Sequence, residues 1–332
     1  MNIPGINAGD ISRYRSELMG TAILFVILFH VGLDRYDMFY GLKRCGNIGV
    51  DMFLFVSGVG MWFAMAKKPS LPRFFRHRYL RVYPTWFLLA CLFYIPDYLG
   101  PRAYSVSLTD LVGDIAVNWD FWLYDELTFW YVPAVMMLYF FVPAYVRLIK
   151  RSAVWRWLPV LMIVWCVAVQ WVRPIHESVG HIEIFWSRVP IFFIGINAGR
   201  AVMEQRRSDG HSTCMALLAL VSTAALCIYL EQVRHGHFPL FVERLVYIPL
   251  CCSLTVLLCL SFAHTPRWLN TSLRFLGGIS LEIYLIHLHF VLCRVEPLGW
   301  SYWPTFLLTL VVSVAIAWVV RQLTTRAVSY IK

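Results

Sequence analysis

The chain has 332 residues, of which 59% are hydrophobic and only 14% are charged. Soluble domains average about 45–50% apolar and about 25% charged residues, so the composition excludes an ordinary soluble protein and predicts a polytopic membrane protein. The formal net charge of +10 would suit a nucleic-acid partner, but the lysines and arginines gather between the apolar runs, as membrane topology requires. We therefore expect membrane lipids, and no nucleic acid, among its partners.

Ten apolar runs have about the 17–25 residues that a helix needs to cross a bilayer. They cover residues 18–33, 48–66, 82–99, 127–148, 157–172, 184–203, 214–230, 245–262, 275–293 and 302–320. These runs predict an all-α fold, a polytopic bundle of about ten transmembrane helices that forms one integral-membrane domain over residues 1–332. The sixth run carries a GxxxG pattern at Gly195 and Gly199, which is typical of close helix packing.

The distribution of basic residues predicts how the bundle is oriented. If the N-terminus lies in the cytoplasm, most of the 29 lysines and arginines fall on the cytoplasmic side, and this bias sets membrane topology. The longest loop on the other side, residues 100–126, is acidic. We expect a multi-pass protein of the cell (plasma or inner) membrane with both termini in the cytoplasm, and no cleaved signal peptide before the first run.

The first two runs each carry an ionisable residue. His30 stands about twelve residues into the first run, roughly 18 Å along a helix, and Asp51 stands near the start of the second. Because antiparallel neighbours would bring both to a similar depth, we expect Asp51 to hydrogen-bond one imidazole nitrogen of His30 and to leave the other free as a catalytic base. The alternative is that His30 bridges two helices as a polar group and that Asp51 meets water at a helix end.

A basic segment that reads LPRFFRHRYLRVYP precedes the third run. Guanidinium groups grip phosphate with two parallel hydrogen bonds, so Arg76, Arg78 and Arg81 are candidates to hold a nucleotide-like cofactor at the cytoplasmic face. The alternative is a plain topology signal or contact with lipid headgroups.

The ninth run contains GGISLEIYLIHLHF. Glu282 is expected to face the bundle interior, because a lipid-facing acid is costly, and it is a candidate substrate-binding residue. His287 and His289 are two positions apart and point to different faces of a helix, so they predict a structural network and no metal site. The nine cysteines form no CxxC or CxxxC pattern, and we expect neither a disulfide framework nor a metal centre.

Three further residues are candidates for a substrate site. Trp130 and Tyr139 in the fourth run could line a sugar site, although an interfacial aromatic belt would explain Trp130 equally well. Arg188 in the sixth run could hold a substrate anion, or it could pair with Glu183.

Six segments, in this order, resemble the membrane-bound acyltransferase-3 family of O-acyltransferases. They are ELMGTAILFVILFH, GVDMFLFVSG, FFRHRYLRVYP, WYVPAVMMLYFFVP, SRVPIFFIG and GGISLEIYLIH. The resemblance implies transfer of an acyl group, often acetyl, from cytosolic acyl-CoA as co-substrate, with no permanently bound cofactor, to a hydroxyl of a glycan or lipid-linked saccharide. By the matching motifs, His30 would be the catalytic histidine, Arg78 and Arg81 would contact the CoA phosphates, and Asp51 belongs to the GVD motif.

Two positions depart from the pattern of that family. An arginine often stands eleven residues before the histidine of the first run, whereas this chain has Met19. Either Arg15 or Arg13 takes its part, or this contact with the cofactor is lost. The aromatic helix often carries acids where this chain has PAVM at residues 133–136. We therefore expect a divergent subgroup, in which the acceptor and the acyl donor need not be those of the best-known members.

Two other functional classes stay open at this point. A proton-coupled transporter or flippase of a glycan precursor would use His30, Asp51 and Glu282 to relay protons. A membrane scaffold would tolerate replacement of all three.

Overall fold

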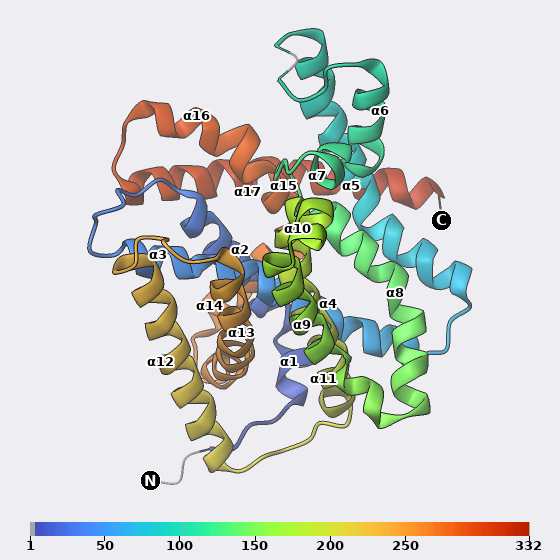
Figure 1. The fold of residues 1–332 in the computed structure, drawn as a ribbon, viewed down its shortest axis with the longest axis vertical. Helices are drawn as coiled ribbons and strands as arrows, with labels where there is room; N and C mark the ends of the chain where they lie inside the picture. Colours follow the sequence, from blue (N-terminus) through green and yellow to red (C-terminus); the bar gives the residue numbers. More distant parts are fainter. Residues whose placement is uncertain (1–3, 102, 332) are drawn as a thin grey trace.

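The computed structural model describes residues 4–101 and 103–331. This part of the chain is helical and holds no β-strand, only an isolated bridge between Asn7 and Arg207. The helices pack side by side around a buried centre (Figure 1). The elements in chain order are α1 (Gly9–Arg13), α2 (Arg15–His30), α3 (Tyr40–Arg44), η1 (Cys45–Asn47), α4 (Ile48–Ala66), α5 (Leu71–Leu99), α6 (Leu108–Val117), α7 (Trp119–Leu123), α8 (Tyr131–Arg151), η2 (Ala153–Trp157), α9 (Leu158–Trp171), α10 (Arg173–Val179), η3 (Gly180–Ile182), α11 (Glu183–Met203), α12 (Gly210–Gln232), α13 (Leu240–Phe262), α14 (Arg267–Gly278), α15 (Ser280–Ile286), η4 (His287–Leu292), α16 (Cys293–Val295), η5 (Glu296–Leu298) and α17 (Tyr302–Ile331).

The predicted all-α membrane bundle is confirmed. In the described part of the chain, eight helices are long and apolar enough to cross a membrane, and a ninth span results if the bent pair Arg267–Gly278 and Ser280–Leu298 counts as one. The remaining predicted run forms α2, which has 16 residues and is shorter than these spans. Leu18, Ala22 and Val26 on α2 have no exposed surface, so this helix is enclosed by its neighbours.

The predicted close packing at the GxxxG pattern is also confirmed. The contact lies between α11 and α4, where a Cβ atom added at Gly195 would come 2.2 Å from the carbonyl oxygen of Phe55 and one added at Gly199 would come 2.3 Å from Cβ of Trp62. Both distances are far below van der Waals contact, so only glycine allows these two helices to approach so closely.

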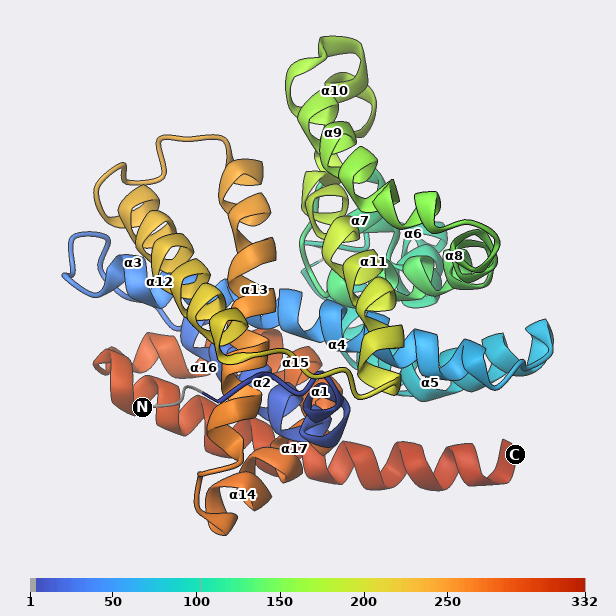
Figure 2. The same ribbon diagram turned by 90° about the horizontal axis from the view of Figure 1, so that it is seen from below.

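Two helices are longer than the sequence predicted. α5 begins at Leu71, where Ser70 is extended and a proline lies in the first turn, an arrangement that favours a helix start. The basic segment before the third run is therefore helical and not a loop. α17 continues past residue 320 to Ile331, and its last turns run beside α5 (Figure 2).

The ninth run is not one straight helix. The chain bends by 64° between α14, which ends at Gly278, and α15, which begins at Ser280. A π-helix, His287–Leu292, then follows α15 directly. Such π-turns are rare and often occur at functional sites, and this one presents His287 to the bundle interior.

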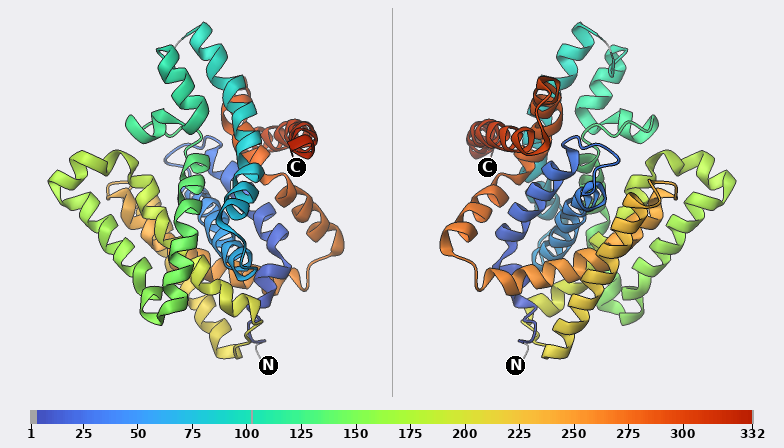
Figure 3. Two further views of the ribbon diagram at one scale, coloured as in Figure 1. Left: turned by 90° about the vertical axis from the view of Figure 1, so that its right-hand side faces the viewer. Right: turned by 90° about the vertical axis from the view of Figure 1, so that its left-hand side faces the viewer.

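The long loop predicted between the third and fourth runs contains α6 and α7, which lie at one end of the molecule beside the end of α5 (Figure 3). Ser107 caps α6 by accepting a hydrogen bond from the backbone N–H of Asp110 at 3.1 Å. Leu108 and Val112 are exposed on α6, whereas Asp114 and the nearby Asp120 are buried.

Candidate active site

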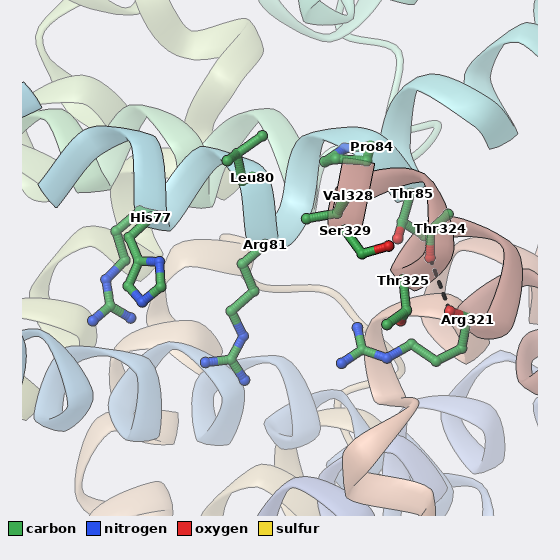
Figure 4. A pocket seen from close by; sticks show the side chains of 11 residues that line it. His77, Leu80, Arg81, Pro84, Thr85, Arg321, Thr324, Thr325, Val328 and Ser329 are labelled. Atoms are coloured by element: carbon green, nitrogen blue, oxygen red, sulfur yellow. Dashed lines mark hydrogen bonds between the residues drawn. The ribbon is translucent and has the colours of Figure 1, made fainter. Parts of the chain in front are cut away.

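A cavity of about 430 Å³ opens between the first half of α5 and the last turns of α17. His77 and Arg81 extend from α5, and Arg321 extends from α17, toward the space between the two helices (Figure 4). Arg78 and several hydroxyl groups complete a lining of donors. Donors of this kind are well suited to phosphate groups.

A second cavity, of about 230 Å³, adjoins the first and shares Arg78, Arg81 and Arg321 with it. Its other walls come from α2, α4, α8, α14 and α15. Arg15 and Met19 line it from α2. Of the two arginines expected to replace the one missing at position 19, Arg15 therefore lies in the cavity, whereas Arg13 is not part of its lining.

Among the described residues, Glu282 is the one acid that lines either cavity. Its Oε1 accepts hydrogen bonds from Thr85 Oγ1 at 3.4 Å and from Arg321 Nη1 at 3.3 Å, and its Oε2 has no hydrogen-bond partner in this part of the chain. Glu282 is buried, as predicted. It lines the same cavity as Arg78 and Arg81, the candidates for cofactor binding, and does not lie in a separate substrate site.

Arg76 does not join the two other cofactor candidates. Arg78 and Arg81 are three residues apart and share one face of α5, whereas a residue two positions before Arg78 points to a different face. Arg76 is exposed and lies outside both cavities. Arg76 therefore does not lie with Arg78 and Arg81 in the cavities, whereas Arg321 from α17 does; the cofactor contact expected of these arginines stays a prediction.

The two aromatic substrate candidates occupy different places. Tyr139 lines the second cavity, and its hydroxyl lies 3.3 Å from Ser57 Oγ. Trp130 is about two and a half turns earlier on the chain, outside both cavities, with the Arg188 guanidinium 5.5 Å from its ring centroid. The prediction that Trp130 and Tyr139 line one site is therefore not supported by their positions.

The predicted hydrogen bond between Asp51 and His30 is wrong. Asp51 is fully buried on α4 and accepts a hydrogen bond from Arg188 Nη1 in a buried ion pair. Arg188 Nη2 also donates to Asn47 Oδ1 at 2.8 Å. A cation stabilises a fully desolvated carboxylate better than a neutral imidazole would. Arg188 on α11 is that cation. Glu183, the alternative partner suggested for Arg188, pairs instead with Arg244.

His30 faces another histidine. Its Nδ1 lies 2.8 Å from the carbonyl oxygen of Val26 and 3.2 Å from Nε2 of His287. The two rings meet edge to face, with centroids 4.9 Å apart. His287 is buried, and its own Nδ1 lies 2.7 Å and 3.1 Å from the carbonyl oxygens of Tyr284 and Ile283.

These contacts assign the protons on the two rings. Nδ1 of His287 faces only carbonyl oxygens, so it carries the hydrogen, and its neutral ring has an acceptor at Nε2. Nδ1 of His30 faces a carbonyl and that acceptor, so it must donate. The remaining nitrogen, Nε2 of His30, therefore keeps its lone pair and can act as a base.

Tyr284 connects the arginine cavities with the paired imidazoles. It lines the second cavity, and its ring centroid lies 5.9 Å from that of His287 one turn later on the chain. Tyr131 also packs against Tyr284, with ring centroids 5.2 Å apart. A chain of buried rings thus runs from the cationic cavity to His30.

Comparison with known families decides the class of the protein. The family model of an acyltransferase domain matches residues 18–322, nearly the whole chain. The chain belongs to the acyltransferase-3 family. Its long apolar helices make this acyltransferase a membrane enzyme. No curated protein and no solved structure matches the chain.

Two residues of the candidate site were not assigned to it from the sequence. Arg321 directly follows the last apolar run, and the sequence does not predict that α17 extends beyond that run beside α5. His287 was assigned to a structural network because its contact with His30 joins segments 257 residues apart. The signal for His287 was its place in an apolar run, where an ionisable residue is costly.

Proposed function

We propose that the acyltransferase transfers an acyl group, typically acetyl, from cytosolic acyl-CoA to a hydroxyl of a saccharide on the opposite side of the cell membrane, with His30 as general base. The observation that carries this proposal is the path from the arginine-lined cavities through Tyr284 to the paired imidazoles of His287 and His30. Transfer across a bilayer needs a binding site for the charged donor at one end and a base at the other.

The cavities suit the donor. Arg78, Arg81 and Arg321 offer planar donors to the phosphates of CoA. The thin pantetheine arm would follow the second cavity inward. Met19 lines that cavity, and His30 lies eleven residues further along the chain, about 16 Å along the helix axis. An extended pantetheine arm spans this distance, so the thioester can reach the histidine while the nucleotide stays at the membrane surface.

The reaction then needs one base and no external reductant or oxidant. Nε2 of His30 takes the proton from the acceptor hydroxyl, and the oxygen attacks the thioester carbonyl carbon. The tetrahedral intermediate collapses, its carbon–sulfur bond breaks, and the sulfur of CoA leaves. The imidazolium returns its proton to that sulfur, which gives an O-acyl ester and free CoA. His287 Nε2 accepts from Nδ1–H of His30 throughout and stabilises the charged ring.

A transfer assay tests this proposal. Purified protein in detergent is given acetyl-CoA labelled in the acetyl group and surface saccharides extracted from cells that lack the protein, and ester-linked label is counted. His30→Ala should lower the rate by about 10²–10⁴-fold, the usual contribution of a positioned base, while the protein stays folded in the membrane. His289→Ala is the matched control, since His289 lies two residues after His287 and packs on Phe129.

Full activity of His30→Ala would remove His30 from the mechanism. Absence of transfer by the native protein, with any acyl-CoA supplied, would overturn the proposed donor. A requirement for a sealed compartment and a proton gradient would favour transport.

A further inference from the structure

A groove of about 1060 Å³ lies along the second half of α2, whereas the arginine-lined second cavity lies at the start of that helix. α2, α12, α13 and the start of α17 form its walls, and the segment between α2 and α4 closes one end. Apolar residues make up most of the lining, among them Phe25, Leu28, Leu220, Ala224 and Leu254. α12 is the most exposed of the spans, so the groove lies on a side of the bundle that meets the lipid.

One end of the groove carries a cation with no ion-pair partner among the described residues. Lys43 lies on the groove wall, half-buried, with its ammonium 5.6 Å and 5.7 Å from the ring centroids of Phe29 and Tyr40. The two nearby arginines, in contrast, have an ion-pair partner, because Arg35 and Arg44 both pair with Glu231 at 3.1 Å. Lys43 is therefore the cation in this group that is available to an anion entering the groove.

Lys43 also lies close to the base. The Phe29 ring that its ammonium covers has its centroid 5.0 Å from that of the His30 ring. The Lys43 ammonium and the His30 ring thus both lie next to the Phe29 ring. A phosphate held at Lys43 would place a sugar attached to it within reach of His30.

We propose that the groove binds a long-chain lipid phosphate that carries the saccharide acceptor. Its hydrocarbon tail lies between α12, α13 and α17, its phosphate contacts Lys43, and its saccharide points toward His30. This inference rests on the proposed acyl transfer and names the class of its acceptor. The tail keeps the acceptor in the bilayer beside the groove, whereas a free saccharide would have to reach the site from water.

The polar rim fits the saccharide better than it fits an ordinary phospholipid. Asp34 and Asp37 line the groove, and each carboxylate already accepts a hydrogen bond from a nearby backbone N–H, of Tyr36 and Phe39 respectively. Their remaining lone pairs can accept from sugar hydroxyls. Trp300, which is exposed at the same rim, offers the flat apolar face on which sugar rings commonly pack.

A binding experiment tests the groove without requiring catalysis. The full-length protein in nanodiscs is labelled with a polyprenyl phosphate that carries a photoreactive group in its tail, and the labelled residues are mapped by mass spectrometry. We expect labelling to concentrate on the groove-lining residues of α12 and α13. Unlabelled polyprenyl phosphate should displace the probe at least tenfold more effectively than polyprenol or phosphatidylcholine.

Two neighbouring alanines on α12 provide a matched pair of variants. Ala224→Phe fills the groove and should reduce labelling at least fivefold, whereas Ala225→Phe, at an exposed position outside the lining, should leave it unchanged. Lys43→Gln should remove the preference for phosphate over polyprenol while tail labelling persists.

Labelling spread evenly over the lipid-facing surface, or equal displacement by phosphatidylcholine, would show ordinary lipid in the groove and overturn the inference. Equal labelling of the two alanine variants would do the same. Each of these results is independent of acyl transfer. The inference about the groove can therefore be disproved while the proposed function stands, and the proposed function can be disproved while lipid binding in the groove is confirmed.

Discussion

The two ends of α2 lie in chemically different surroundings. At its start, Arg15 joins Arg78, Arg81 and Arg321 around cavities that hold one acid among the described residues. At its end, His30 meets a second imidazole and a backbone carbonyl, and no carboxylate hydrogen-bonds either ring in the described part of the chain. Binding a charged donor needs cations at the membrane surface, whereas a base must stay neutral until it takes a proton.

The comparison also concerns Asp51, which is not the partner of His30. The orienting contact that a carboxylate would make with one imidazole nitrogen is made here by Nε2 of His287, 3.2 Å from Nδ1 of His30. Asp51 has a different role, since it and Arg188 form a buried pair that joins α4 to α11.

The largest effect expected is on stability and concerns this pair. Asp51→Ala leaves Arg188 buried without its partner and should destabilise the protein by about 3–5 kcal/mol. Adding Arg188→Met removes the second charge and should restore most of that loss. Thermal unfolding in detergent measures both. If Asp51→Ala abolished activity and kept full thermal stability, Asp51 would belong to the chemistry after all.

The next effect separates the orienting histidine from a merely structural one. His287→Phe keeps a ring but loses the Nε2 acceptor, so kcat should fall about 100-fold, within the range for a mispositioned base, with KM for acetyl-CoA unchanged. His287→Gln retains an acceptor oxygen and should recover part of the rate. Steady-state kinetics and the pH profile of kcat test this, and equal activity of both variants would assign His287 to packing alone.

Variants at the arginine cavities should change KM and leave kcat nearly unchanged, the opposite of the variants at His287. Arg321→Gln removes one charge-assisted hydrogen bond, worth about 1.5–3 kcal/mol, and should raise KM for acetyl-CoA about tenfold or more, with kcat nearly unchanged. Arg76→Gln changes the charge of the exposed α5 face and should leave KM within twofold. A larger effect from Arg76→Gln than from Arg321→Gln would mean that the nucleotide binds elsewhere on α5.

The smallest effect concerns the loop outside the spans. Burial, and then the neighbouring Asp114, raise the pKa of Asp120 to about 7. A raised carboxyl pKa means that the folded state holds a proton that the unfolded state has already lost, so stability falls as pH rises from about 4 to about 7. Asp120→Asn should therefore match the native protein near pH 4 and exceed it by about 1–2 kcal/mol at pH 8.

Thermal unfolding across this pH range checks the prediction for Asp120. Asp125→Asn, at an exposed position of the same loop, is the matched control. A parallel shift of both variants with pH would show that Asp120 titrates like an ordinary surface acid.

The sequence predicted features that depend on neighbours along the chain. The apolar runs, the burial of Glu282 and the close packing at Gly195 all follow from local periodicity and composition. The errors concern pairing between distant segments. Asp51 and His30 stand on adjacent runs, yet each found its partner on a later helix, Arg188 on α11 and His287 after α15. Depth in the membrane can be counted from sequence, whereas the direction in which a side chain faces depends on how the helices rotate against one another.

The π-helix that begins at His287 has a consequence for how this site could diversify. A π-turn holds one residue more than an α-turn, so removing a single residue from the segment His287–Leu292 would restore regular winding. Side chains beyond the deletion would then swing by roughly 100° about the axis. Relatives without the extra residue would need a hydrogen-bond partner for the histidine that corresponds to His30 at another position. The length of this short segment would then distinguish the two groups of relatives more reliably than the identity of any amino acid in it.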